Sequence, residues 1–262
     1  MNAEHTHVPI VPRERLDFGL EGDIPRYWMD NDAFKTRFFD AMSTLFPQGE
    51  KFFITSVREF KDEVTDPKLQ AEVRDFTRQE AQHSLIHRQF NDRLAAQGVD
   101  IDSIDRQLAE HFFERRELLE ASDPRVRAMY AWHAVEEVEH KAVAFDVLQQ
   151  VAKVSYVRRI LSMVLVSIGF PITVMMIMNH MLQVDGFSRW QRARMWLKGL
   201  WWFHKPGGLF SNTWGYYFAY YKPGFHPWKV KEMPSYGTWL QTFEATGDAV
   251  AAGNALHAAA GR

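Results

Sequence analysis

Residues 79–87, with the sequence QEAQHSLIH, place polar side chains where a helix would face its core. Glu80, His83 and His87 follow one another at steps of three and four residues, which puts them on one face of a helix. Apolar residues continue this face on both sides, from Val73 to Leu94. Because buried carboxylates and imidazoles need partners, this face predicts either a metal site or a buried polar network.

Residues 133–140, with the sequence HAVEEVEH, repeat the pattern. Here His133, Glu137 and His140 lie on an apolar face that runs from Val126 to Val151. Two helices would therefore each direct a Glu-x-x-His pair inward. A pair of cations needs carboxylates that bridge them and an imidazole for each, and the i,i+3 spacing directs one of each toward the same point.

In ferritin-like di-iron bundles the other two helices supply single glutamates. Glu50 is the candidate on one of them, because it falls on an apolar face where a carboxylate needs a partner. On the helix predicted over 102–121 we prefer Glu114, with Glu110 and Glu117 as alternatives. The predicted metal ligands are Glu50, Glu80, His83, His87, Glu114, His133, Glu137 and His140.

The alternative to a metal site is a buried network of ion pairs and hydrogen bonds. Arg58 and Arg74 are its candidate counter-charges. Burying three or four carboxylates beside two arginines is costly, so we favour the metal site. Glu136 and Glu139 lie one step off the polar face and are expected to be solvated or to support the ligands from outside.

Start and stop signals divide the first half of the chain into helices with short loops. Asp66 and Pro67 begin a long helix that Gly98 ends, and Pro124 opens another that reaches about Val151. Before them we expect a helix from residue 31 or 32 to about 45 and a second one opened by Pro47. No segment alternates as a strand does. The predicted fold is all-α: a ferritin-like four-helix bundle with additional C-terminal helices, one of them strongly apolar.

We divide the chain into an extended arm (1–31), a metal-binding bundle (32–153), an apolar and aromatic extension packed on the bundle or on a membrane (154–235), and a C-terminal tail (236–262) whose last residues, from Gly247 on, look frayed or disordered. Residues 160–182 are long enough for a membrane-spanning helix and hold no Asp, Glu, Lys or Arg. A buried central helix is the alternative. Trp and Tyr mixed with Lys over 196–222 suit an interfacial belt or an aromatic core.

Composition excludes some classes of protein. The chain has 31 basic and 33 acidic residues, so no nucleic-acid-binding surface is expected. It has no cysteine, which removes thiolate metal sites and Cys nucleophiles. Its first residues lack the apolar region of a secretory signal, so we expect a cytoplasmic protein, associated with the inner membrane if residues 160–182 insert.

The sequence resembles the bacterial family of predicted metal-dependent hydrolases, whose members resemble ferritin-like proteins. The segments that carry the resemblance are 48-QGEKFFITSVREF-60, 76-FTRQEAQHSLIH-87, 132-WHAVEEVEHKAVAFDV-147 and 223-PGFHPW-228. The spacing of His133, Glu137 and His140 is also similar to that of di-iron arylamine N-oxygenases, in which an extra histidine joins the ligand set. That resemblance implies Glu50, Glu80 and His83 as further ligands, and leaves open whether His87 replaces a third-helix carboxylate or supports the shell from outside.

Three functions follow. The first is an O2-dependent oxidase or oxygenase that holds two metal ions, iron before manganese or zinc, and takes a hydrophobic or lipid-like substrate and an electron donor. The second is a hydrolase in which two metal ions activate a water. The third is a membrane-associated metal-binding protein without catalysis. An oligomer is compatible with each of them.

Overall fold

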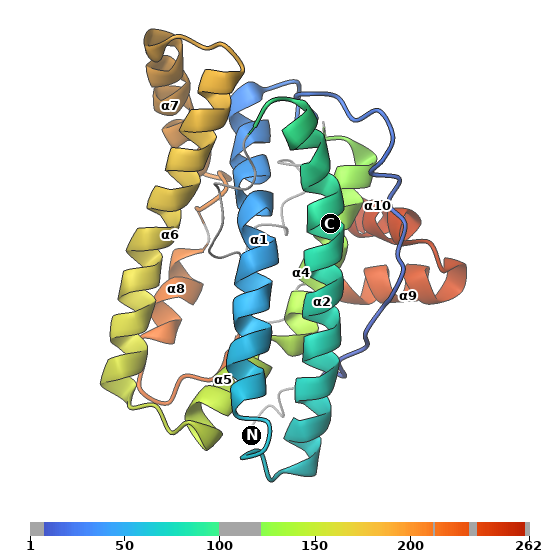
Figure 1. The fold of residues 1–262 in the computed structure, drawn as a ribbon, viewed down its shortest axis with the longest axis vertical. Helices are drawn as coiled ribbons and strands as arrows, with labels where there is room; N and C mark the ends of the chain where they lie inside the picture. The colour runs from blue at the N-terminus through green and yellow to red at the C-terminus, as the bar shows by residue number, and fades with distance from the viewer. Residues whose placement is uncertain (1–7, 100–121, 212, 231–234, 260–262) are drawn as a thin grey trace.

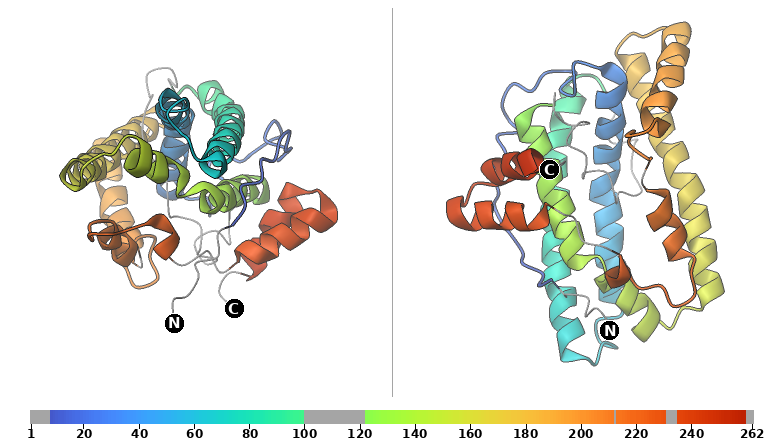
Figure 2. Two further views of the ribbon diagram at one scale, coloured as in Figure 1. Left: turned by 90° about the horizontal axis from the view of Figure 1, so that it is seen from below. Right: turned by 180° about the vertical axis from the view of Figure 1, so that it is seen from behind.

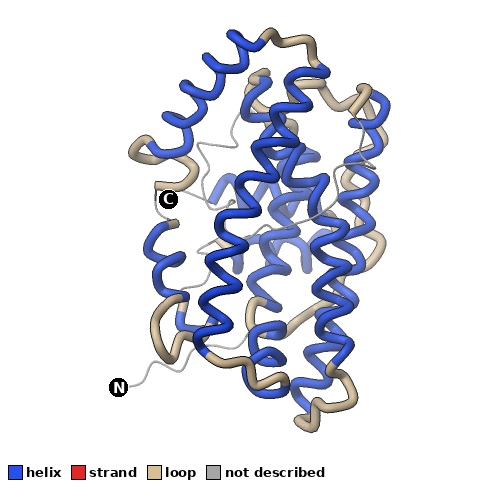
Figure 3. Tube along the Cα trace, turned by 60° about the vertical axis from the view of Figure 1, so that its left-hand side comes forward, coloured by secondary structure: helices blue, strands red, loops and turns tan. Residues whose placement is uncertain are grey.

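The computed structural model describes residues 8–99, 122–211, 213–230 and 235–259. Helices make up its regular structure and no strand occurs among these residues (Figures 1 and 3); the only β-type pairing there is an isolated bridge between Met29 and Ser122. The all-α prediction is confirmed. The helix predicted over 102–121, with Glu110, Glu114 and Glu117, lies outside the described residues, so the ferritin-like arrangement of four core helices is not shown.

Helix α1 (Ala33–Glu59) is unbroken, and the side chain of Asp32 caps it by accepting hydrogen bonds from two backbone N–H groups. The predicted start is confirmed, but the division into two helices at Pro47 is wrong: Pro47 lies in the interior of the helix. Since proline has no N–H, the carbonyl of Ser43 lacks its usual donor four residues on. The side-chain amide of Asn91 supplies a hydrogen bond to that carbonyl instead, at 2.8 Å.

Helix α2 (Pro67–Ala96) begins at the predicted cap, Asp66, and packs antiparallel to α1 (Figure 1). Helix α4 (Pro124–His140) also begins as predicted, with Asp123 as its cap. It ends earlier than we expected, because a turn at residues 141–142 separates it from α5 (Val143–Asp146) and the π-helical turn η1 (Val147–Val151). No proline or glycine marks this break.

The C-terminal half covers two sides of this core. Helices α6 (Tyr156–Val184) and α7 (Arg189–His204) pack on α1, and α8 (Trp214–Tyr220) and the short η2 (Pro227–Lys229) follow them on this side of the molecule. Helices α9 (Tyr236–Thr246) and α10 (Ala249–Ala259) lie on the opposite side, where α10 packs on α4 and α9 packs on α10 (Figure 2). The expectation that the residues from Gly247 on are frayed is therefore wrong for Ala249–Ala259. This alanine-rich sequence is an ordered helix because it packs closely against α4.

Helix α6 is long and apolar enough to cross a membrane by length and composition. Only 11% of its most apolar window is buried. The alternative of a buried central helix is therefore wrong. The extended arm, by contrast, is bound to the bundle: its described part buries Arg13, Phe18 and Trp28.

Two buried apolar clusters are separated by a polar layer. On α1 the larger cluster ends at Phe46 and the smaller begins at Val57, with Glu50 between them. On α2, Glu80 and His83 lie between Phe76 of the smaller cluster and Ile86 of the larger one. His140 at the end of α4 lies between Val135 of the larger cluster and Val143 of the smaller one. The fold thus holds the predicted ligands in a layer closed by apolar side chains at both ends.

Candidate metal centre

The polar layer contains two groups of three side chains that could each hold a metal ion. The first group is Glu50, His83 and His133, and the second is Glu80, Glu137 and His140. Within each group the candidate ligand atoms lie within 4.8 Å of one another. Helix α1 supplies Glu50, α2 supplies one residue to each group with Glu80 and His83, and α4 supplies the rest. Six of the predicted ligands therefore meet at one place.

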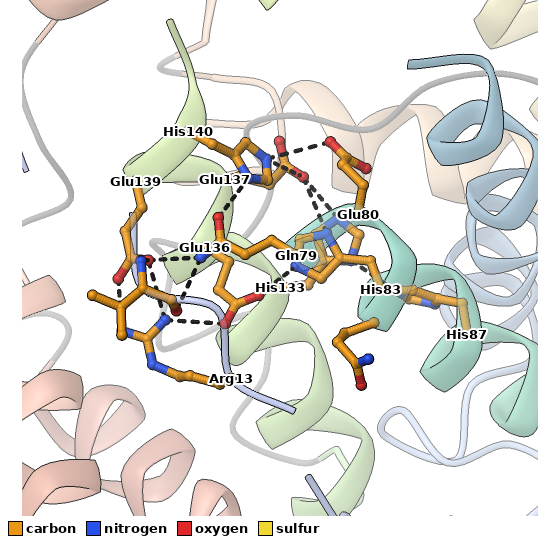
Figure 4. Close-up of polar contacts among 12 residues, drawn as sticks. Arg13, Gln79, Glu80, His83, His87, His133, Glu136, Glu137, Glu139 and His140 are labelled. Carbon is orange, nitrogen blue, oxygen red and sulfur yellow. Dashed lines mark hydrogen bonds and ion pairs between the residues drawn. The ribbon is translucent and has the colours of Figure 1, made fainter. Parts of the chain in front are cut away.

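Glu137 joins the two groups (Figure 4). Its Oε1 atom lies 3.2 Å from Nε2 of His133, 3.2 Å from Nε2 of His140 and 3.6 Å from Nδ1 of His83. Oε1 of Glu80 lies 3.5 Å from the same nitrogen of His140. One carboxylate oxygen of Glu137 thus faces one ring nitrogen of each of the three histidines, and it connects the two groups of candidate ligands.

The partners of His140 fix which of its nitrogens carries the proton. Gln79 donates its amide N–H to Glu139 at 2.7 Å and to the carbonyl of Val11 at 3.2 Å. Its amide oxygen, 2.9 Å from Nδ1 of His140, can only accept. Nδ1 is therefore the donor in the neutral ring, and the lone pair of Nε2 faces the centre.

His83 is oriented by a carboxylate. Its Nε2 lies 3.1 Å from Oε2 of Glu136, while Oε1 of Glu136 accepts from Arg13 at 3.0 Å. Burial raises the pKa of Glu136 to about 7 in spite of Arg13, and above that pH the carboxylate only accepts. Nε2 of His83 then donates, which leaves the lone pair of Nδ1 toward the centre.

His133 is oriented by a chain of three side chains. Ser43 has one hydroxyl proton, and Oδ1 of Asn91, 2.8 Å away, can only accept it. Ser43 must therefore accept from Nδ1 of His87, also at 2.8 Å. The other nitrogen of His87 is then an acceptor for Nδ1–H of His133, at 2.8 Å, so Nε2 of His133 carries the lone pair toward the centre.

His87 accordingly uses both of its ring nitrogens in this chain and belongs to neither group of candidate ligands. The interpretation that it supports the shell from outside fits this placement better than its prediction as a ligand. The orientation of Asn91 has its origin in Pro47, since the amide N–H of Asn91 is directed to the carbonyl that this proline leaves without a donor.

Glu139 is the centre of a second supporting network, and the sequence analysis did not identify its partners from the N-terminal arm and α9. Its carboxylate accepts hydrogen bonds from both terminal nitrogens of Arg13, the backbone N–H of Val11, the hydroxyl of Tyr236 and the amide of Gln79. The N-terminal arm and α9 thereby close over α4. The sequence analysis assigned no role to Arg13, which lies in the irregular N-terminal arm, or to Tyr236, the first residue of α9.

The alternative network based on Arg58 and Arg74 is wrong, because both side chains are exposed. The buried counter-charge is Arg13, which pairs with Glu136 and Glu139. These two glutamates support the ligands and are not solvated. Among the described residues, neither Glu50 nor Glu137 forms an ion pair with Lys or Arg.

Burial and neighbouring charges shape the protonation of the centre. Burial raises the pKa of Glu50 well above its usual value, and the negative charge of Glu137 raises it further. Burial also lowers the pKa of His83, as does the neighbouring His133. For Glu137 burial acts in the opposite direction, but the imidazoles of His140 and His133 outweigh it and hold the pKa low. These surroundings thus favour a neutral His83 beside an ionised Glu137, and these are the protonation states in which imidazole and carboxylate bind metal ions.

A metal ion fits these residues. Three buried atoms of the first group have no hydrogen-bond partner among the described residues: both carboxylate oxygens of Glu50 and Nδ1 of His83. The hydroxyl of Ser84 on α2 donates its proton to the carbonyl of Pro47. Buried polar atoms without partners are costly, and cations bound by carboxylate and imidazole would satisfy them.

Comparison with known proteins agrees with the site. A family model described as "Predicted metal-dependent hydrolase" matches residues 12–110 and 106–231, so the chain belongs to this family. Searches of curated proteins and of solved structures gave no match.

Proposed function

We propose that this member of the predicted metal-dependent hydrolase family cleaves its substrate with water at a centre of two metal ions. The observation that carries the proposal is the position of Glu137, whose one oxygen faces nitrogens of three histidines and connects the two groups of candidate ligands. The family description supports the hydrolase, which the sequence held as the alternative. Neither the comparisons nor the described residues support the O2-dependent oxidase.

Glu50, His83 and His133 would hold one ion and Glu80, Glu137 and His140 the other, with Glu137 shared. Bound there, two metal ions would supply a water of lowered pKa and positive charge to stabilise the anion formed when an ester, amide or phosphoester is attacked.

The chain's own contribution is to orient the ligands and to restrict water. The partners of the three histidines direct one lone pair of each ring to the same oxygen of Glu137, so little rearrangement is needed on binding. The two apolar clusters close the layer at both ends. Glu137 keeps 18% of its side chain exposed, more than any of its ion-pair partners, and we infer that water and substrate enter on its side.

The test is removal and return of the metal. The purified protein is treated with a chelator and assayed on panels of chromogenic esters, amides and phosphoesters before and after addition of Zn²⁺, Mn²⁺ or Fe²⁺. The proposal predicts hydrolysis that disappears with the metal and returns with it, and that Glu137→Gln lacks. The exposed Glu59 of α1 gives the matched control, Glu59→Gln, which should behave as the wild type. Metal-dependent consumption of O2 without hydrolysis of any panel would contradict the proposal and favour the oxidase.

A further inference from the structure

The layer formed by α6, α7 and α8 exposes apolar side chains in an ordered way. On α6 six residues at steps of three and four form one continuous face: Val157, Leu161, Leu165, Ile168, Ile172 and Met176. Each of them is between 50% and 71% exposed. A continuous exposed apolar face of six residues indicates a surface that binds a partner or a membrane.

The same layer exposes aromatic residues on its other helices. Trp190 and Trp201 of α7 are 81% and 67% exposed, and Trp214 and Phe218 of α8 are also exposed. Tryptophan is enriched where proteins meet the boundary between lipid and water, because one part of its ring is apolar and its N–H is polar.

The charge of this segment differs from that of the rest of the chain. Residues 147–230 contain ten basic residues: Lys153, Arg158, Arg159, Arg189, Arg192, Arg194, Lys198, Lys205, Lys222 and Lys229. They contain one acidic residue, Asp185, whose side chain is buried in ion pairs with Arg26 and Arg37. The described surface of residues 147–230 therefore presents basic side chains and no exposed acidic side chain, although the whole chain carries a net charge of −2.

We propose that the α6–α8 layer docks on a bilayer that contains anionic phospholipid, with α6 lying in the plane of the interface. Apolar residues would enter the boundary of the acyl chains, while Arg189, Arg194 and Lys198, all exposed on α7, would meet the headgroups. The combination of an apolar face on α6 with exposed basic residues on the adjoining helix α7 favours such a membrane over an uncharged apolar partner.

The packing of α6 explains why it would lie flat and not span. Its other face buries Val174, Ile177 and Met181 in the main core, and α6 packs on α1. Helix α1 in turn packs on α2, which exposes charged residues such as Lys68 and Arg78. For α6 to cross a bilayer, the bundle would have to enter the hydrocarbon with it, and burying its exposed charged side chains there would be very costly.

The test is binding of the full-length protein to vesicles, measured by co-sedimentation. Vesicles of phosphatidylcholine with phosphatidylglycerol are compared with vesicles of phosphatidylcholine alone. We expect binding to the first that weakens with salt, and weak binding to the second. Replacing Leu165 or Met176 by Gln should weaken binding about tenfold each, because each loses the transfer of one apolar side chain.

The charge contribution is tested with Arg189→Gln, Arg194→Gln and Lys198→Gln, each expected to weaken binding to the anionic vesicles about fivefold. The matched controls are Phe52→Gln on α1 and Leu85→Gln on α2. Both remove an exposed apolar residue outside the layer and should leave binding unchanged.

Three results would overturn the proposal. The first is equal binding to both kinds of vesicle, or none. The second is a dimer in solution that Leu165→Gln dissociates, which would make the layer an interface between two copies of the chain. The third is protein in cell membranes that high salt and alkaline carbonate fail to release and only detergent extracts, which would show that α6 spans.

Discussion

Within the bundle the buried layer is polar, whereas on the α6–α8 layer the exposed face is apolar. His83 is fully buried and Glu50 nearly so, yet Leu165 is 71% exposed. Proteins usually bury apolar side chains and expose charged ones; the bundle instead buries polar groups, and α6 exposes apolar ones. Both reversals cost free energy if the molecule is considered alone.

The two regions differ in how these side chains are satisfied. In the bundle most of the polar groups around the candidate ligands have partners inside the protein, and the atoms that remain converge on one place. On α6 the apolar face has no partner within the described chain. The comparison therefore predicts an ion for the first region, because a small cation completes it, and an extended surface for the second.

The largest effect is expected from Arg13→Met. It leaves Glu136 and Glu139 buried without their cation, and removing one partner of a buried ion pair costs about 3–5 kcal/mol of the free energy of unfolding. Arg78→Met removes an exposed pair with Glu14 and should cost less than about 1 kcal/mol. Urea denaturation of both variants measures the difference, and equal losses would contradict the described network.

A smaller effect is expected from Asn91→Ala, which leaves the buried carbonyl of Ser43 without a donor and should cost about 1–3 kcal/mol. In a Pro47→Ala background the new backbone N–H can bond to that carbonyl, so the same change should cost less. The double-mutant cycle therefore gives a coupling of about 1 kcal/mol or more. Strictly additive losses would show that Asn91 does not compensate for the proline.

The smallest effect on stability is expected from Leu165→Gln. Because its side chain is exposed in the folded protein, the free energy of unfolding should change by no more than about 0.5 kcal/mol. Leu94→Gln, at a fully buried position of α2, serves as the contrast and should destabilise by several times as much. A large loss from Leu165→Gln would mean that this face is buried within the protein in solution.

The sequence predicted the start of a helix correctly where a capping residue stands directly before a stretch with helical spacing of its apolar residues. Asp66 with Pro67 and Asp123 with Pro124 begin helices as expected. The inward faces of α2 and α4 also follow from their spacing, since that spacing alone brings side chains to one side of a helix. Glu50 was found in the same way.

What the sequence could not show depends on contacts between distant segments. Pro47 looks like the start of a helix because the amide that compensates for it belongs to Asn91, on another helix. His87 matched the ligand spacing, and only the positions of Ser43 and Asn91 distinguish a support from a ligand. Arg13 lies in an irregular arm, where no period predicts that its guanidinium reaches α4.

The central claim is that two metal ions share Glu137. Elemental analysis of the purified wild type, Glu137→Gln and the exposed control Glu59→Gln tests it most directly. We expect about two metal ions per chain in the wild type and the control, and the loss of at least one in Glu137→Gln, because a shared ligand contributes to both sites. Two ions retained in Glu137→Gln, or none in the wild type purified from metal-replete cells, would contradict the claim.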